Sequence, residues 1–76
     1  MSAPPELARE FPSQTDRIHA LRDSDARFRA LTNRYHDTNR AVYRAQVRIE
    51  PVSQAEETLL RQERAQLKDQ IGRALA

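Results

Sequence analysis

The sequence predicts an all-α protein: a long antiparallel helical hairpin, coiled-coil-like in its packing, with a short N-terminal helix. In the stretch 28–49 the side chains suited to an interior recur at alternating intervals of three and four residues, with no Gly or Pro between them. This spacing places them on one stripe of an α-helix. A matching pattern follows in 54–75, and Pro51 separates the two stretches. Because the connection is short, the two helices must fold back against each other.

The first ten residues are assigned to a mobile tail. Pro4 and Pro5 prevent a regular element from starting before them, so at most one helical turn is expected, at 6–10. Residues 11–76 then form a single helical-hairpin domain.

The first helix is expected over about 14–22. Ser13 precedes it and can cap its free backbone amides, with Asp16 three residues later. Phe11 lies just before this cap, where its ring can pack on the same helix or on the hairpin.

A second, long helix is expected over about 25–49. Asp23, Ser24 and Asp25 favour caps and turns over helix interiors, because their short polar side chains compete for backbone amides. Whether they separate two helices or only kink one is left open by the sequence. Pro51 ends the long helix, since it disfavours helical geometry in the residue before it.

The third helix is expected over about 54–75. Ser53 and Glu56 have the spacing of a capping box at its start. Gly72 is about 1 kcal/mol worse than Ala in a helix interior, which suggests that the last turn frays.

The residues of the hairpin seam share the heptad spacing and are expected to face the opposite helix. They are Phe28, Leu31, Tyr35, Val42 and Ile49 on the long helix, and Leu60, Arg64, Leu67 and Ile71 on the third, with Thr38 and Ala74 at further inward positions. Arg64 occupies a seam position where an aliphatic residue would stabilise more. Either its stem lies along the apolar groove while its head reaches an acid, such as Asp37 or Glu63 of a neighbouring chain, or it sets register and partner choice.

Three apolar residues, Tyr43, Val47 and Leu59, fall on the flanks of the seam stripes. They can pad the core under the first helix or provide contacts between copies of the chain, and the sequence favours neither. A chain of 76 residues buries little apolar surface, so we expect self-association, as a homodimer.

The charge balance gives one further candidate surface. Formal net charge is only +2, but the span 25–50 carries six arginines against three acids. On the long helix Arg29, Arg40 and Arg44 fall together with His36 on the side away from the seam. Such a row could bind an anion or follow phosphates, while a solvated face is the plainer interpretation.

The sequence contains little that points to catalysis. There is no cysteine, the single glycine excludes a glycine-rich phosphate loop, and the two histidines, His19 and His36, lack a metal-ligand spacing. We therefore expect no enzyme activity, no cofactor and no metal. No segment has the pattern of a signal peptide or a membrane span, so a cytoplasmic protein without membrane contact is expected.

Three segments, REFPSQTDRIHALRDSDARF, RYHDTNRAVYRAQ and LLRQERAQLKDQI, resemble the YdcH-like family of small bacterial proteins over about residues 9–75. The shared features are a Phe-Pro near the start, a Tyr in the long helix and a basic run ending in Leu-Lys-Asp-Glu-Ile, where this chain has Gln70 in place of the acid. The resemblance implies a helical hairpin able to form coiled-coil structures, in a family largely of unknown function. It brings no catalytic residues.

These observations favour a non-enzymatic interaction or scaffolding module that self-associates and presents helix surfaces to a protein partner. The alternative from another class is a nucleic-acid-binding accessory protein that uses the arginine-rich helix face.

Overall fold

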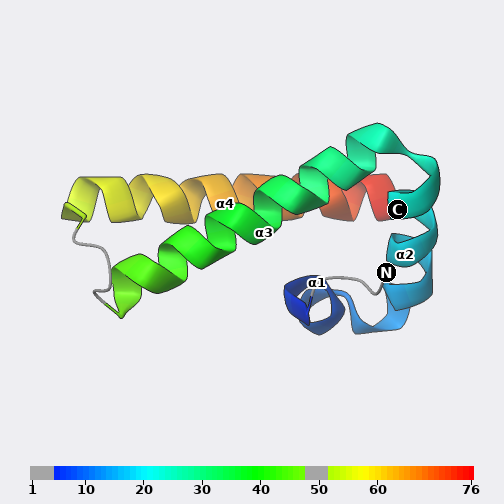
Figure 1. Cartoon of the computed structure of the whole chain (residues 1–76), viewed down its shortest axis with the longest axis horizontal. Helices are drawn as coiled ribbons and strands as arrows, with labels where there is room; N and C mark the ends of the chain where they lie inside the picture. The colour runs from blue at the N-terminus through cyan, green and yellow to red at the C-terminus, as the bar shows by residue number, and fades with distance from the viewer. Residues whose placement is uncertain (1–4, 48–51) are drawn as a thin grey trace.

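The structure is a computed structural model that describes residues 5–47 and 52–76. Within these residues there is no strand, and the prediction of an all-α hairpin with a short N-terminal helix is confirmed (Figure 1). The elements in chain order are α1 (Pro5–Glu10), the 3-10 turn η1 (Pro12–Gln14), α2 (Thr15–Ser24), α3 (Ala26–Gln46) and α4 (Gln54–Leu75).

Helices α3 and α4 form the hairpin, and α3 crosses α4 obliquely (Figure 1). α4 has the bounds that the sequence predicts. The Ser53 side chain accepts a hydrogen bond from the Glu56 amide at 3.1 Å, which confirms the predicted cap. α3 ends at Gln46 with Val47 as its C-cap, short of the expected residue 49. Ile49, a predicted seam residue, lies outside the described residues.

A sharp corner separates α2 from α3, so the structure contains two helices where the sequence left a kinked single helix open. Asp25 adopts an extended backbone, and its carboxylate accepts hydrogen bonds from the amides of Arg27 and Phe28 at 2.9 and 3.2 Å. Arg29 closes the corner from the other side, because its Nε donates to the Arg22 carbonyl oxygen at 2.8 Å. These bonds satisfy backbone groups at both helix ends.

The N-terminal segment differs from the expectation in two ways. Ser13 does not cap a helix, since it lies inside η1 and α2 starts from Gln14 without a side-chain cap. Residues 5–10, assigned to the tail, form α1, and Leu7 is completely buried. The burial of Leu7 in the core holds this short helix against the rest of the protein. The sequence analysis had assigned it to a mobile tail because of the prolines at its start.

The core lies where α1, α2 and the adjoining parts of α3 and α4 meet. Its buried members are Leu7, Ile18, Phe28, Tyr35, Leu67, Ile71 and Leu75. Leu75 is buried whereas Ala74 is exposed, so the inward stripe of α4 ends one residue later than expected. The last turn is helical through Leu75, and the ring of Phe11 packs beside Gly72. None of the helices in the described part of the chain has both the length and the apolar character that crossing a membrane requires.

Candidate functional site

The predicted seam residues divide into a buried group and a half-buried group. Phe28, Tyr35, Val42, Leu67 and Ile71 are buried, while Leu31, Leu60 and Arg64 are half-buried. Leu60 belongs to the part of the hairpin near the α3–α4 connection, which we call the tip. The cluster of core residues ends at Tyr35 on α3 and Leu67 on α4, and among the described residues closer to the tip only Thr38 and Val42 are buried.

Thr32 is a completely buried residue that the sequence analysis missed. Its hydroxyl donates to the Arg29 carbonyl oxygen at 3.0 Å and accepts a hydrogen bond from Arg22 Nη1. Arg22 reaches across from α2, and its Nη1 also donates to Asn33 Oδ1 at 3.1 Å. Thr32 follows Phe28 by four residues, and this spacing would have predicted an inward position. The apolar Leu31, three residues after Phe28, was assigned to the seam instead.

Arg64 reaches neither of the acids that the sequence suggested. Its Nη1 donates to Asn39 Oδ1 on α3 at 3.1 Å. Glu63, offered as an acid on a neighbouring chain, instead accepts a hydrogen bond from Arg34 Nη2 at 3.3 Å within the same chain. One polar link thus joins α3 and α4 on each side of the seam.

α1 lies on one side of the hairpin and makes a polar contact with each of the two long helices. Glu6 Oε1 lies 2.7 Å from His36 Nδ1 on α3, and Glu10 Oε2 lies 2.6 Å from Lys68 Nζ on α4. The hydrogen bond to Glu10 raises the pKa of Lys68. Burial raises the pKa of the Tyr35 hydroxyl, and the negative charge of Glu10 adds to this effect.

The predicted anion-binding face is not a continuous row. Arg29 is engaged at the α2–α3 corner, about 16 Å along the helix from Arg40. Arg40 and Arg44 border a hollow with Asn39 and Tyr43, but the Glu6 carboxylate lines the same hollow. Glu6 Oε2 is buried and accepts no hydrogen bond. A negative group among the arginines weakens the attraction of this face for phosphates.

The association candidates are exposed, with 57 % of Tyr43, 47 % of Val47 and 63 % of Leu59 accessible. They do not form one strip. Tyr43 lies on the α1 side of the hairpin, because it shares a hollow with Glu6. Leu59 and Arg64 are five residues apart and project about 140° from each other. Since Arg64 bonds to Asn39 on the α1 side, Leu59 is turned away from it.

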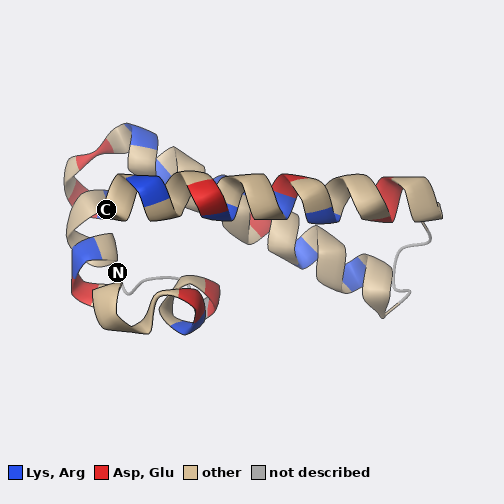
Figure 2. Ribbon diagram, turned by 180° about the vertical axis from the view of Figure 1, so that it is seen from behind, with Lys and Arg blue, Asp and Glu red and all other residues tan. Residues whose placement is uncertain are grey.

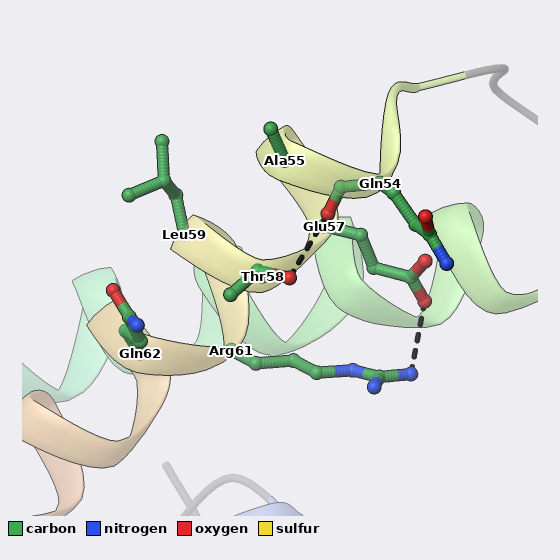
Figure 3. A pocket seen from close by; sticks show the side chains of 7 residues that line it. All are labelled: Gln54, Ala55, Glu57, Thr58, Leu59, Arg61 and Gln62. Carbon is green, nitrogen blue, oxygen red and sulfur yellow. Dashed lines mark hydrogen bonds and ion pairs between the residues drawn. The ribbon is translucent and has the colours of Figure 1, made fainter.

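Leu59 belongs to an exposed face of α4, which we call the outer face. Its members are Ala55, Thr58, Leu59, Gln62 and Gln66, all of them exposed and none charged. Figure 3 shows Leu59 directed away from α3, above a shallow hollow formed by α4 alone. At the edge of this hollow Arg61 Nη2 donates to Glu57 Oε1 at 2.9 Å.

Charged residues of both signs follow one another along α4, as Figure 2 shows. In the span 55–66 five residues are charged, and all five project to other sides of the helix than the outer face: Glu56, Glu57, Arg61, Glu63 and Arg64. The outer face is thus uncharged between Ala55 and Gln66, and the same stripe continues into the charged Asp69 and Arg73.

The histidines do not assemble with other ligands. His19 Nε2 lies 3.8 Å from Asp23 Oδ2 one turn away, and His36 pairs with Glu6. Among the described residues no three His, Cys, Asp or Glu side chains gather in a way that could hold a metal ion.

Comparison with known families gives one match. The family described as "Protein of unknown function (DUF465)" matches residues 28–75, which includes nearly all of α3 and the whole of α4. This is the family that the resemblance names, although the match leaves out the N-terminal segment. Searches of curated proteins and of solved structures found no match. Because the matched residues make up more than half of the chain, this protein belongs to the DUF465 family.

Proposed function

We propose that this protein is a non-enzymatic interaction module, which self-associates by coiled-coil-like helix packing and presents helix surfaces to a protein partner. The observation that carries the proposal is where the exposed apolar side chains lie. In the described part of the chain the exposed large hydrophobic residues are Tyr43, Val47, Val52 and Leu59, and all of them belong to the tip.

Single exposed apolar side chains are ordinary on protein surfaces, but a concentration of them at one end is characteristic of contact surfaces. The cluster of core residues lies at the opposite end of the hairpin, and among the described residues between Tyr35 and Leu67 only Thr38 and Val42 are buried. Complete burial of a large apolar side chain contributes about 1.5–3 kcal/mol. Covering the tip with another helix would therefore supply apolar burial that the single chain lacks.

The shape of the hollow at the outer face supports the non-enzymatic part of the proposal. The hollow at the outer face is formed by one face of one helix. Catalytic pockets are concave and enclose most of a small ligand, which such a surface does not do.

In-cell crosslinking followed by affinity capture tests the proposal, with a variant that places charge on both sides of the tip, Tyr43→Glu with Leu59→Glu. The matched control is Ala30→Glu, which adds the same side chain at an exposed position far from the tip. We expect the crosslinked species of the wild-type protein to persist in the control and to disappear in the tip variant. Circular dichroism confirms that both variants keep their helicity. Identical crosslinked species in wild type and tip variant would refute the proposal.

A further inference from the structure

A hollow between three helices has walls that carry more positive than negative charge. We call it the three-helix hollow, because α1, α3 and α4 each supply part of its wall, and its volume is about 310 Å³. Small-ligand sites in proteins have volumes of about 300–1,000 Å³, so it has room for a small molecule. Its polar and charged lining residues are Glu10, Tyr35, Asn39, Arg61, Arg64 and Lys68. They carry three positive charges against one negative charge.

Tyr35 supplies an unused hydrogen-bond donor in the three-helix hollow. The residue is only 3 % exposed and belongs to the core cluster. The charges of Glu10, Arg64 and Lys68 all act on the pKa of its hydroxyl, so the hydroxyl end of the ring lies among these side chains. The hydroxyl makes no hydrogen bond to any of the described residues. Buried tyrosine hydroxyls normally have a partner, so this donor is available to a molecule bound in the hollow.

Arg64 and Lys68 are the two cations closest to this hydroxyl, and only one of them has an acidic partner. Lys68 Nζ lies 2.6 Å from Glu10 Oε2, so an anionic oxygen already binds between α1 and α4. Arg64 Nη1 donates to the neutral Asn39 Oδ1 at 3.1 Å, and Arg64 forms no ion pair with any of the described residues. Its positive charge is therefore available to an anion in the three-helix hollow.

Arg61 and two acids stand at the rim of the three-helix hollow or just beyond it. Arg61 Nη2 donates to Glu57 Oε1 at 2.9 Å, and 51 % of the Arg61 side chain is exposed. Exposed ion pairs contribute little free energy, so the Arg61 guanidinium can turn toward an anion in the hollow. Glu6 is paired with His36. Neither Glu57 nor Glu6 lines the hollow, so most of the charges nearest to a bound group are positive.

We propose that the three-helix hollow binds the phosphate group of a small phosphate monoester. Arg64, Lys68 and the Tyr35 hydroxyl donate to the phosphate oxygens, and Arg61 adds a donor from the rim. A phosphate monoester carries about 1.5–2 negative charges at pH 7 and three acceptor oxygens, which suits a site with several donors and net positive charge. A phosphate diester, as in nucleic acids, has a single negative charge and should bind more weakly. This binding goes beyond the proposed function and does not depend on it.

The first test is a titration of the full chain with inorganic phosphate and with methyl phosphate, followed by amide NMR spectra. We expect saturable binding with a dissociation constant in the millimolar range or below. The amide signals that move should be those of residues around the hollow, such as Tyr35, Asn39 and Arg64. Dimethyl phosphate, a diester, should bind at least about tenfold more weakly than methyl phosphate.

Two variants that remove donors test the proposed contacts. Tyr35→Phe keeps the buried ring and loses only the hydroxyl, and Arg64→Gln loses the charge. Each should raise the dissociation constant for methyl phosphate by about tenfold, as expected for one hydrogen bond to a charged group. The matched control is Arg27→Gln, which removes the same charge at an exposed position about 18 Å along α3 from Asn39. In this control the dissociation constant should stay within about twofold of the wild-type value.

A third variant should change the affinity in the opposite direction. Glu10→Gln removes the negative charge of the lining residues and frees Lys68 from its ion pair. Because a carboxylate repels phosphate, this variant should lower the dissociation constant for methyl phosphate by about threefold or more. Loss of folded structure cannot produce tighter binding, so this result would not depend on the stability of the variant. Circular dichroism checks that all four variants keep the wild-type helicity.

Four outcomes would overturn the proposal. The first is that methyl phosphate moves no amide signal around the three-helix hollow. The second is that Tyr35→Phe binds methyl phosphate as tightly as the wild-type chain does. The third is that Arg27→Gln weakens binding as much as Arg64→Gln, which would indicate attraction by net charge alone. The fourth is that dimethyl phosphate binds as tightly as methyl phosphate, which would point to phosphate diesters such as those of nucleic acids.

Discussion

Replacing Leu67 and Leu59 by alanine, one at a time, tests the packing of the hairpin. Both residues belong to α4, but Leu67 is 3 % exposed and Leu59 is 63 % exposed. Ala has the highest helix propensity, so neither substitution weakens the helix by itself. A difference between the two variants therefore measures tertiary packing.

The expected magnitudes follow from burial. Leu67→Ala loses the burial of the side chain and leaves a cavity among the core residues, which costs about 2–5 kcal/mol. Leu59 buries only about a third of its side chain, so Leu59→Ala should cost about 0.5–1 kcal/mol. A 76-residue domain has an unfolding free energy of about 4–11 kcal/mol, so the first loss is a large share of the total.

Urea denaturation followed by circular dichroism measures both values, at a protein concentration where light scattering finds no association. Leu67→Asp extends the test, because an unpaired charge in the core should abolish helicity and assembly together. Equal losses of unfolding free energy in the two alanine variants would refute the packing described here, and so would a Leu67→Asp protein with wild-type helicity.

Three further predictions follow from single contacts. Gly72→Ala should raise the unfolding free energy by about 0.5–1 kcal/mol, because the added methyl group would lie 3.8 Å from the ring of Phe11, an ordinary contact; a lower urea midpoint would contradict this. Arg40→Glu should leave helicity and solution mass unchanged, since Arg40 is exposed on the side away from α4; loss of either would show that Arg40 has a structural role. Folding raises the pKa of Tyr35 above 10.0 and that of Lys68 above 10.5, so the unfolded chain releases these protons first and stability should fall as the pH rises above about 10. Thermal unfolding of wild type and Tyr35→Phe across this range should show a shallower decline in the variant.

The local features of the sequence determined most of the secondary structure. α4 was predicted over about 54–75 and spans Gln54–Leu75, and the caps at Asp25 and Ser53 form as their side-chain chemistry suggests. Caps and helical periodicity depend on residues within one or two turns, so they can be read from a linear chain. The prediction that Ser13 caps the first helix was wrong, because the 3-10 turn after Phe11 delays the start of α2 by one residue.

Which side chains are buried and which stay exposed depended on packing between segments far apart in the chain. Nothing near Leu7 in the sequence indicates the space that it fills, and the choice of Asn39 as the partner of Arg64 depends on how α3 rotates against α4. The separation of Tyr43 from Leu59 onto opposite sides of the tip has the same origin.

The sequence by itself determined that this protein is a helical hairpin with apolar side chains on the flanks of its seam stripes, because heptad spacing and helix caps are local properties. Only the tertiary structure decided which of those side chains stay exposed. The crossing of α3 over α4 and the docking of α1 distribute them over two surfaces, and that distribution depends on contacts that no stretch of sequence contains.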